Sequence, residues 1–344
     1  MLVPTPDIIA FIIFIALAFD FTNGFHDSAN SISTVISTKV LSPQRAVVFA
    51  AFFNFIAAFF FGVAVAATIS KIINLDYVDA LIVPYIILAA LLGAIGWNLI
   101  TWYSGLPTSS SHALIGSLAG AGISAAGFAA IKLGTIDTVI IFMVLSPIIG
   151  FIIAFLFMAC VLWISKGAQR MVAERHFRRL QLCSAAAYSF SHGTNDAQKT
   201  IGIITPLLFS IGYYGATVDP NNLPVPVWVI VAAYGAIAIG TLSGGWRIVK
   251  TMGYRITRLR PVDGFAAETS GAATIIGASI AGIPVSTTHV ISSSIMGVGA
   301  TQGTGYVRWG VARRIMWAWI LTLPVSAFMG YVFFSVIFYL VNLV

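Results

Sequence analysis

Charged residues are scarce in this sequence: Asp, Glu, Lys and Arg make up 8% of its 344 residues, against about 25% in soluble domains. Hydrophobic residues make up 59%, and several runs have the length of about 20 residues that crosses a bilayer as a helix. This composition excludes a soluble globular protein. The alternation of apolar and polar residues that a membrane β-barrel needs is missing, so we predict an all-α polytopic membrane protein.

Cysteine is rare as well. Cys160 and Cys183 both lie near apolar segments, so neither a disulfide framework nor a cysteine metal motif is predicted. The net charge of +7 could indicate a nucleic-acid partner. In a membrane protein, however, Lys and Arg usually gather on the cytoplasmic side, and their distribution along the chain supports this second interpretation. We expect no nucleic-acid partner.

Ten apolar segments alternate with more polar connections. We place them near residues 8–38, 45–70, 81–104, 107–131, 136–163, 182–210, 227–249, 265–281, 284–300 and 315–342. The basic segment 166–181 separates the first five from the last five. If it lies in the cytoplasm, all of the 18 Lys and Arg residues except Lys71, Lys132 and Lys199 fall inside. This bias predicts that both termini lie outside the cell.

The two halves of the chain resemble each other. "FTNGFHDSANSIST" at 21–34 aligns with "FSHGTNDAQKTIGI" at 190–203, and "GLPTSSSH" at 105–112 aligns with "GIPVSTTH" at 282–289. Small and polar residues also recur wherever membrane helices pack closely, but several anchors in the same order favour a duplication.

Each half has an odd number of predicted spans, so the halves should face opposite ways. We therefore predict two inverted-topology repeats, 1–165 and 182–344, joined by the cytoplasmic segment 166–181. Broken helices or re-entrant hairpins should carry the polar motifs. This is the architecture of secondary transporters, whose binding site lies between the repeats near the middle of the membrane.

Two acids occupy equivalent places in the repeats, Asp27 and Asp196. An ionised Asp at the centre of a membrane helix costs at least about 2.5–3.5 kcal/mol, so each should pair with something or bind a cation. With Asn30 and Asn195 beside them, they are candidate ligands for Na⁺ or carriers of a proton. The alternative is a buried polar cluster that only holds helices together.

Two further residues are candidates for the coupling of ion movement to transport. His26 adjoins Asp27, and histidine gains and loses a proton near neutral pH. Glu268 is another intramembrane acid. No resident cofactor is expected beyond the coupling ion, H⁺ or Na⁺.

The second motif predicts an anion site. Pro107 and Pro284 should break a helix, and hydroxyl residues then begin a new one, with its free N–H groups and partial positive charge. We expect phosphate or another oxyanion to bind there. The candidate residues are Ser109, Ser110, Ser111, Ser286, Thr287 and Thr288, together with Lys199 and Thr200. Ordinary helix capping, which needs no ligand, is the alternative, and we expect structural roles for His112 and His289.

Charge balance points to a coupled carrier. Phosphate near pH 7 carries about −1.5 to −2, and Asp27 and Asp196 would add two more negative charges. Unit charges 4 Å apart interact by about 4 kcal/mol at an effective dielectric constant of 20. The site therefore needs cations to fill, which favours cation-coupled uptake over a passive pore.

These motifs resemble the inorganic phosphate transporter (PiT) family. The resemblance covers nearly the whole chain. It implies symport of phosphate with Na⁺ or H⁺ and often a dimer. It also implies an inverted-repeat fold with half-spanning helices, which raises the expected count to about 10–12 membrane segments. By this resemblance Asp27, Asn30, Asn195, Asp196 and Glu268 match functional acids and amides, and the hydroxyls of Ser109, Ser111, Ser286 and Thr288 match phosphate ligands.

Three departures bear on the coupling ion. His26 stands where sodium-coupled relatives have Asn, Gln198-Lys199 stands where they have Ala-Asn, and Asn54 stands where they have Glu. The chain is closest in appearance to bacterial low-affinity permeases, which resemble proton symporters of metal–phosphate complexes. The resemblance therefore implies proton-driven import of phosphate, which could enter as a complex with a divalent metal.

Several alternatives stay open. The chain could be a Na⁺-coupled phosphate symporter, or a permease for sulfate or another oxyanion. A membrane lipid pyrophosphate phosphatase is a remote alternative, because the Pro/Ser loops hold no Arg and no E-x-x-x-E occurs. We expect a multi-pass protein of the cell membrane that is not an enzyme, a homodimer, and a basic segment that could dock a cytoplasmic accessory protein.

Overall fold

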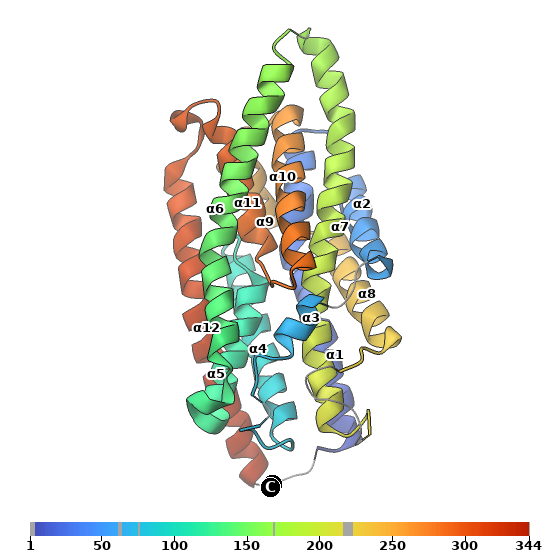
Figure 1. Cartoon of the computed structure of the whole chain (residues 1–344), viewed down its shortest axis with the longest axis vertical. Coiled ribbons are helices and arrows are strands. Elements are labelled where there is room, and N and C mark those ends of the chain that lie inside the picture. Colours follow the sequence, from blue (N-terminus) through green and yellow to red (C-terminus); the bar gives the residue numbers. More distant parts are fainter. Residues whose placement is uncertain (1–3, 61–63, 75, 168, 216–222, 344) are drawn as a thin grey trace.

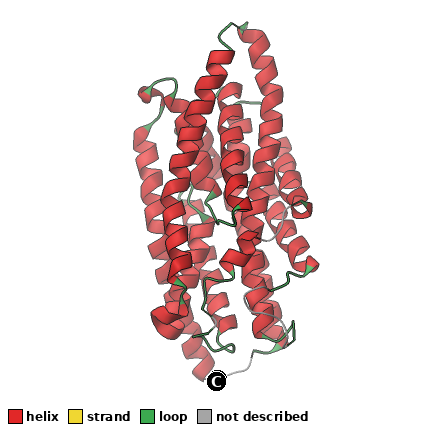
Figure 2. Ribbon diagram, in the orientation of Figure 1, coloured by secondary structure: helices red, strands yellow, loops and turns green. Residues whose placement is uncertain are grey.

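A computed structural model describes residues 4–60, 64–74, 76–167, 169–215 and 223–343. Apart from an isolated antiparallel bridge between Ile73 and Ile131, the regular structure in these ranges is helical (Figure 2). The predicted all-α fold is confirmed.

The helices form one elongated bundle (Figure 1). In chain order they are α1 (Pro6–Ser37), α2 (Pro43–Ile56), α3 (Ala64–Ile69), α4 (Val83–Tyr103), α5 (Ser110–Ala126), α6 (Leu133–Ile164), α7 (Arg170–Ser210), α8 (Val227–Ser243), α9 (Trp246–Lys250), α10 (Pro261–Ile280), α11 (Thr287–Ala300) and α12 (Trp309–Leu343). Short turns of other helical types are η1 (Ala57–Phe59), η2 (Gly127–Ala130), η3 (Thr251–Arg255) and η4 (Thr304–Tyr306).

Five of the described helices are long and apolar enough to cross a membrane: α1, α4, α5 with η2, α6 and α12. The segment from α8 to η3 makes a sixth if its 60° bend is counted within one span. These helices confirm an integral membrane protein. The other predicted spans fall on α2, α7, α10 and α11, which are shorter or carry the polar motifs, so hydropathy and length alone do not identify them.

The same order of elements occurs twice. α1, α4, α5 and α6 have counterparts in α7, α10, α11 and α12, and the long last helix of each half packs on the hairpin of the other: α6 on α11 and α12 on α5. In Figure 1 the colours show that α6 rises from the lower to the upper end whereas α12 descends. α1 begins and α12 ends at the lower end. The inverted-topology repeats and the side of the membrane on which the termini lie stay predictions.

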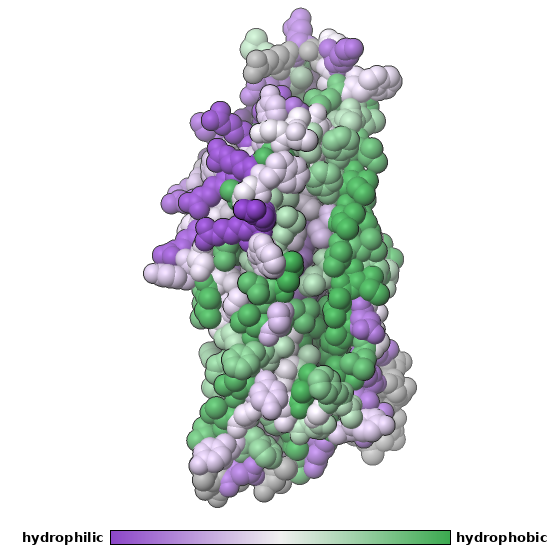
Figure 3. Space-filling model, turned by 90° about the vertical axis from the view of Figure 1, so that its left-hand side faces the viewer, coloured by the Kyte–Doolittle hydropathy of each residue, from purple (hydrophilic) through white to green (hydrophobic). Residues whose placement is uncertain are grey.

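Most of the predicted linker 166–181 is helical. α6 ends at Ile164 and α7 already begins at Arg170, because the Ala, Glu, Arg and Leu residues that follow favour helix. Ala168 lies outside the described residues. The basic start of α7 packs beside the end of α1, since the Arg178 guanidinium donates to the Lys39 carbonyl at 2.6 Å. Hydrophilic residues gather toward this upper end in Figure 3.

Two hairpins place the polar motifs inside the bundle, as the sequence predicts. Gly105 and Gly282, which follow α4 and α10, have φ angles of +64° and +68°, a conformation that glycine adopts without strain at a helix end. A proline two residues later prevents the helix from continuing. α5 and α11 then begin, and Figure 2 shows loops at mid-height of the bundle, where the hairpins turn.

The helices that carry the aspartate motifs cross their neighbours through glycine. A Cβ atom at Gly24 of α1 would lie 2.1 Å from the Ile237 carbonyl oxygen of α8, and one at Gly193 of α7 would lie 2.5 Å from the Asn54 carbonyl oxygen of α2. These carbonyl oxygens belong to the helix backbone, which cannot shift as easily as the end of a flexible side chain. These crossings therefore depend on the missing side chain, and they set the position of Asp27 and Asp196.

We predict that Gly24→Ala and Gly193→Ala each destabilise the protein by about 1–3 kcal/mol, the usual cost of overpacking. The measurement is the midpoint of thermal unfolding in detergent. Gly235→Ala is the matched control, because no atom lies within 4 Å of its Cβ position. Equal midpoints for all three variants would contradict the close crossings.

Candidate functional site

The two repeated acids meet inside the bundle. Asp27 is 1% exposed and Asp196 is 0% exposed, and they come from α1 and α7, which pack against each other. One carboxylate oxygen of each lies within 4.8 Å of the other and of a His192 ring nitrogen. The structure therefore brings the two repeated acids together, and their role in binding a cation stays a prediction.

Asp27 is held by one histidine and by hydroxyls from both hairpins. His26 Nδ1 lies 2.6 Å from Asp27 Oδ1. Ser110, in the first turn of α5, donates to Asp27 Oδ2 at 2.8 Å, and Thr288, in the first turn of α11, donates to Asp27 Oδ1 at 3.4 Å. Asn30 donates to the Thr288 hydroxyl at 2.8 Å. The two halves thus contribute jointly to one carboxylate.

Asp196 has a lysine as its ion-pair partner. Lys199, one turn further along α7, forms an ion pair with Asp196 Oδ1 and also donates to the Ser111 hydroxyl. Thr287 donates to Asp196 Oδ2 at 3.1 Å, and His192 Nε2 lies 3.1 Å from the same oxygen. Lys199 is 1% exposed, so its charge is not shared with water.

The predicted hydroxyls divide into two groups. Ser109 and Ser286 cap their helices, each accepting from a backbone N–H three residues on, of His112 and His289 respectively, at 3.2 Å. This is the capping role that the sequence left open as an alternative. Both keep a hydroxyl proton to donate. The other four, Ser110, Ser111, Thr287 and Thr288, bond to the acids or to Lys199.

Three predicted residues have their hydrogen bonds elsewhere. Asn195 donates to Ser279 of α10 at 3.1 Å, and Thr200 donates to Asp20 at 2.6 Å. Glu268 accepts from Gln181 at 3.0 Å and from Ser184 at 2.5 Å, and we find no hydrogen bond or ion pair between Glu268 and either site aspartate in the described residues. Glu268 therefore belongs to a separate buried polar cluster between α7 and α10.

His192 and Asn23 are site residues that the sequence analysis missed, and Asn23 Oδ1 accepts from the Ser110 hydroxyl at 2.5 Å. His192 precedes Asp196 by four residues, a spacing that puts two side chains on one face of a helix, and this was the available signal. Asn54 of α2 accounts for its position: Asn54 Oδ1 lies 3.4 Å from His192 Nδ1, and Asn54 Nδ2 donates to the Thr241 hydroxyl at 3.0 Å. A neutral amide thus orients the imidazole.

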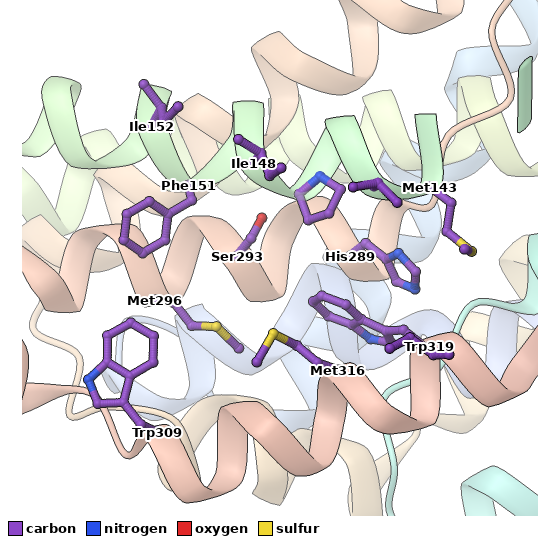
Figure 4. Close-up of a pocket in the computed structure, with 13 residues that line it drawn as sticks. Met143, Ile148, Phe151, Ile152, His289, Ser293, Met296, Trp309, Met316 and Trp319 are labelled. Atoms are coloured by element: carbon purple, nitrogen blue, oxygen red, sulfur yellow. The ribbon is translucent and has the colours of Figure 1, made fainter. Parts of the chain in front are cut away.

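An apolar cavity of about 380 Å³ lies behind the hairpins, between α6, α11 and α12 (Figure 4). The His289 ring stacks on Trp319 at 4.1 Å between centroids and contacts the His112 ring at 4.8 Å. Apart from His289 and Ser293, the cavity lining is made of apolar and aromatic side chains. The cavity is therefore distinct from the aspartate site, and the histidine contact joins the starts of α5 and α11 as a structural element.

The ion pair gives a stability prediction. Lys199→Met leaves Asp196 as an uncompensated buried charge and should cost about 3–5 kcal/mol. The double change Lys199→Met with Asp196→Asn removes that charge and should recover most of the loss. Thermal unfolding in detergent measures both, with Lys166→Met at an exposed position as control. A double variant no more stable than Lys199→Met would argue against the pair.

The sequence of this chain matches those of known proteins. Residues 23–330 match the model of the phosphate transporter family. The chain is 50% identical over 317 residues to a probable low-affinity inorganic phosphate transporter of Rhizobium meliloti, covering 92% of each chain. It is 47% identical over 340 residues to a protein of the same description from Bacillus subtilis, covering 97% of each.

A solved structure described as the sodium-dependent phosphate transporter has a TM-score of 0.86 against this chain and covers 96% of it and 99% of the other chain. The two sequences are 24% identical, so the likeness shows a common fold.

Proposed function

The chain belongs to the phosphate transporter family, and we propose that it imports inorganic phosphate by secondary active symport driven by a proton gradient. The observation that carries the proposal is the meeting of Asp27 and Asp196 between the hydroxyls that begin α5 and α11. The relatives are described as transporters and permeases, not as enzymes, so the phosphatase alternative is not retained.

Phosphate suits this set of groups. The hydroxyls of Ser110 and Thr288, now bonded to Asp27, can rotate to donate to a bound oxyanion. Phosphate also keeps at least one proton near pH 7, which it can donate to a carboxylate. Sulfate is fully ionised and has no proton to give, so a carboxylate beside it would be left without a donor. The aspartates therefore favour phosphate over sulfate.

The partners of the aspartates favour protons as the coupling ion. Lys199 already neutralises Asp196, at the position where a bound Na⁺ would otherwise balance the charge. His26 Nδ1 lies 2.6 Å from Asp27 Oδ1, and His192 Nε2 lies 3.1 Å from Asp196 Oδ2, so each carboxylate has beside it an imidazole, a side chain that can both donate and accept a hydrogen bond. A sodium-coupled mechanism is the alternative, since the similar solved structure is described as sodium-dependent.

A metal–phosphate complex is a second candidate substrate. Asp27, Asp196 and His192 can offer three ligand atoms within 4.8 Å of one another, and carboxylate with imidazole is a usual ligand set for divalent metals. We propose that a divalent ion carried with phosphate would sit against these residues. Movement of the hairpins relative to the long helices would then expose the site to each side in turn.

The proposed phosphate ligands can be tested by binding. Ser110→Ala and Thr288→Val each remove a donor to a charged ligand, a loss of about 1.5–3 kcal/mol. Since about 1.4 kcal/mol is tenfold in affinity, each variant should bind radiolabelled phosphate about 10- to 100-fold more weakly in detergent. Ser210→Ala, at the far end of α7, is the control. Unchanged affinity in both variants would rule out these hydroxyls as phosphate ligands.

The proposed driving ion can be tested by transport. In proteoliposomes, an inward proton gradient should drive accumulation of radiolabelled phosphate, and an inward Na⁺ gradient at equal pH should not. Excess sulfate should not compete. Proteoliposomes holding the Asp27→Asn, Asp196→Asn double variant are the control for leakage.

Three results of this uptake experiment would change the account. A requirement for Na⁺ would keep the transporter and overturn proton coupling. Transport of sulfate in place of phosphate would overturn the substrate. Stimulation by Mg²⁺ would support the metal–phosphate complex, and uptake independent of divalent ions would favour free phosphate.

A further inference from the structure

Asp20 is a third buried acid that the site described above does not use. It lies on α1 and is 0% exposed. Its Oδ1 accepts the Thr200 hydroxyl at 2.6 Å, and its Oδ2 has no hydrogen-bond partner in the described residues. Within the same ranges we find no Lys, Arg or His nitrogen within 4.0 Å of the Asp20 carboxylate. Asp20 therefore lacks the partners that Asp27 and Asp196 have.

This environment favours a carboxylic acid over a carboxylate. An ionised group with one hydrogen bond and no counter-ion is costly in the interior of a membrane protein. A bound proton removes the charge at once. The repeat does not demand an acid here, because Ser189 stands at the equivalent position of the second half. Asp20 is thus not explained as a repeated structural element.

Asp20 lies close to the phosphate site but to one side of it. At 1.5 Å per residue it precedes Asp27 by about 10 Å along α1, toward the start of that helix, which is the predicted outer side. Thr200, its hydrogen-bond donor, directly follows Lys199. The titratable groups that act on Asp20 electrostatically are Asp196 and Lys199 on α7 and Tyr234 on α8.

We propose that Asp20 binds the proton that is transported with phosphate. Its carboxylate oxygen takes one proton from water on the outer side, and the same O–H bond breaks when the proton passes to water on the inner side. An ionised Asp20 would place a second negative charge near Lys199, in competition with Asp196. Protonation of Asp20 therefore leaves the Lys199–Asp196 pair intact while the carrier is loaded. This inference rests on the proposed function.

The test separates proton movement from phosphate movement. In proteoliposomes, uptake driven by a proton gradient requires net proton transfer, whereas exchange of external for internal phosphate at equal pH requires none. Asp20→Asn mimics the protonated acid permanently. The rate of phosphate exchange in this variant should stay within about threefold of wild type, and the rate of gradient-driven uptake should fall at least about tenfold. A pH-sensitive dye inside the vesicles should show no proton entry when phosphate is added.

Two variants serve as controls. Asp20→Glu restores a titratable group and should recover driven uptake and the dye signal. Asp7→Asn changes an exposed acid on the same helix and should leave both activities at the wild-type level. Elution of every variant as a single species in size-exclusion chromatography shows that it is folded.

Each outcome decides between the proposals. Gradient-driven uptake at the wild-type level in Asp20→Asn would overturn the assignment. Loss of both exchange and driven uptake in folded Asp20→Asn would also overturn it, because Asp20 would then belong to the phosphate site or to the framework. Absence of phosphate exchange in the wild type would instead overturn the proposed function itself. Wild-type exchange with uptake driven only by Na⁺ would keep the phosphate carrier and remove proton binding by Asp20.

Discussion

The structure depends on the cost of holding two carboxylates in a membrane. Asp27 and Asp196 are almost completely buried, and neither can remain charged without a partner. Their partners come from four directions: α1, α7 and the first turns of α5 and α11. The breaks after Gly105 and Gly282 make those first turns available at the centre of the bundle. The helix crossings at Gly24 and Gly193 let the two acids approach.

The two acids have different partners, and this difference is the basis of the proposed coupling. Asp27 is held by an adjacent histidine and by hydroxyls, and in the proposed mechanism the hydroxyls turn toward the anion when it enters. Asp196 is held by Lys199, a basic side chain of the same helix. One half of the site is therefore compensated by a side chain of the protein itself, and in the proposed mechanism the other half changes its partners. A carrier built in this way needs fewer mobile cations than one with two uncompensated acids.

Much of this site could be predicted from the sequence because its signals are local or repeated. Glycine and proline at helix ends, followed by serine or threonine, predict the hairpins from backbone chemistry alone. Duplication of the aspartate motif predicts that Asp27 and Asp196 share one site. The number of spans was harder, because α7 and α10 carry polar residues that lower their hydropathy although they lie inside the bundle.

Contacts between distant segments could not be predicted. Nothing in the sequence near His192 shows that Asn54 will orient it, and nothing near Thr200 shows that its hydroxyl donates to Asp20 and not to a phosphate. The packing of α6 on α11 and of α12 on α5 likewise depends on tertiary structure. These are the features that decide which polar residues join the aspartates and which form separate clusters, as Glu268 does.

The most direct measurement of the central claim is an experimental structure of the protein with phosphate bound, determined by cryo-electron microscopy or crystallography. The account predicts phosphate density between the first turns of α5 and α11, in contact with Ser110 and Thr288 and next to Asp27 and Asp196. Phosphate density that touches neither aspartate, with the two carboxylates still bonded to the hydroxyls as described here, would contradict it.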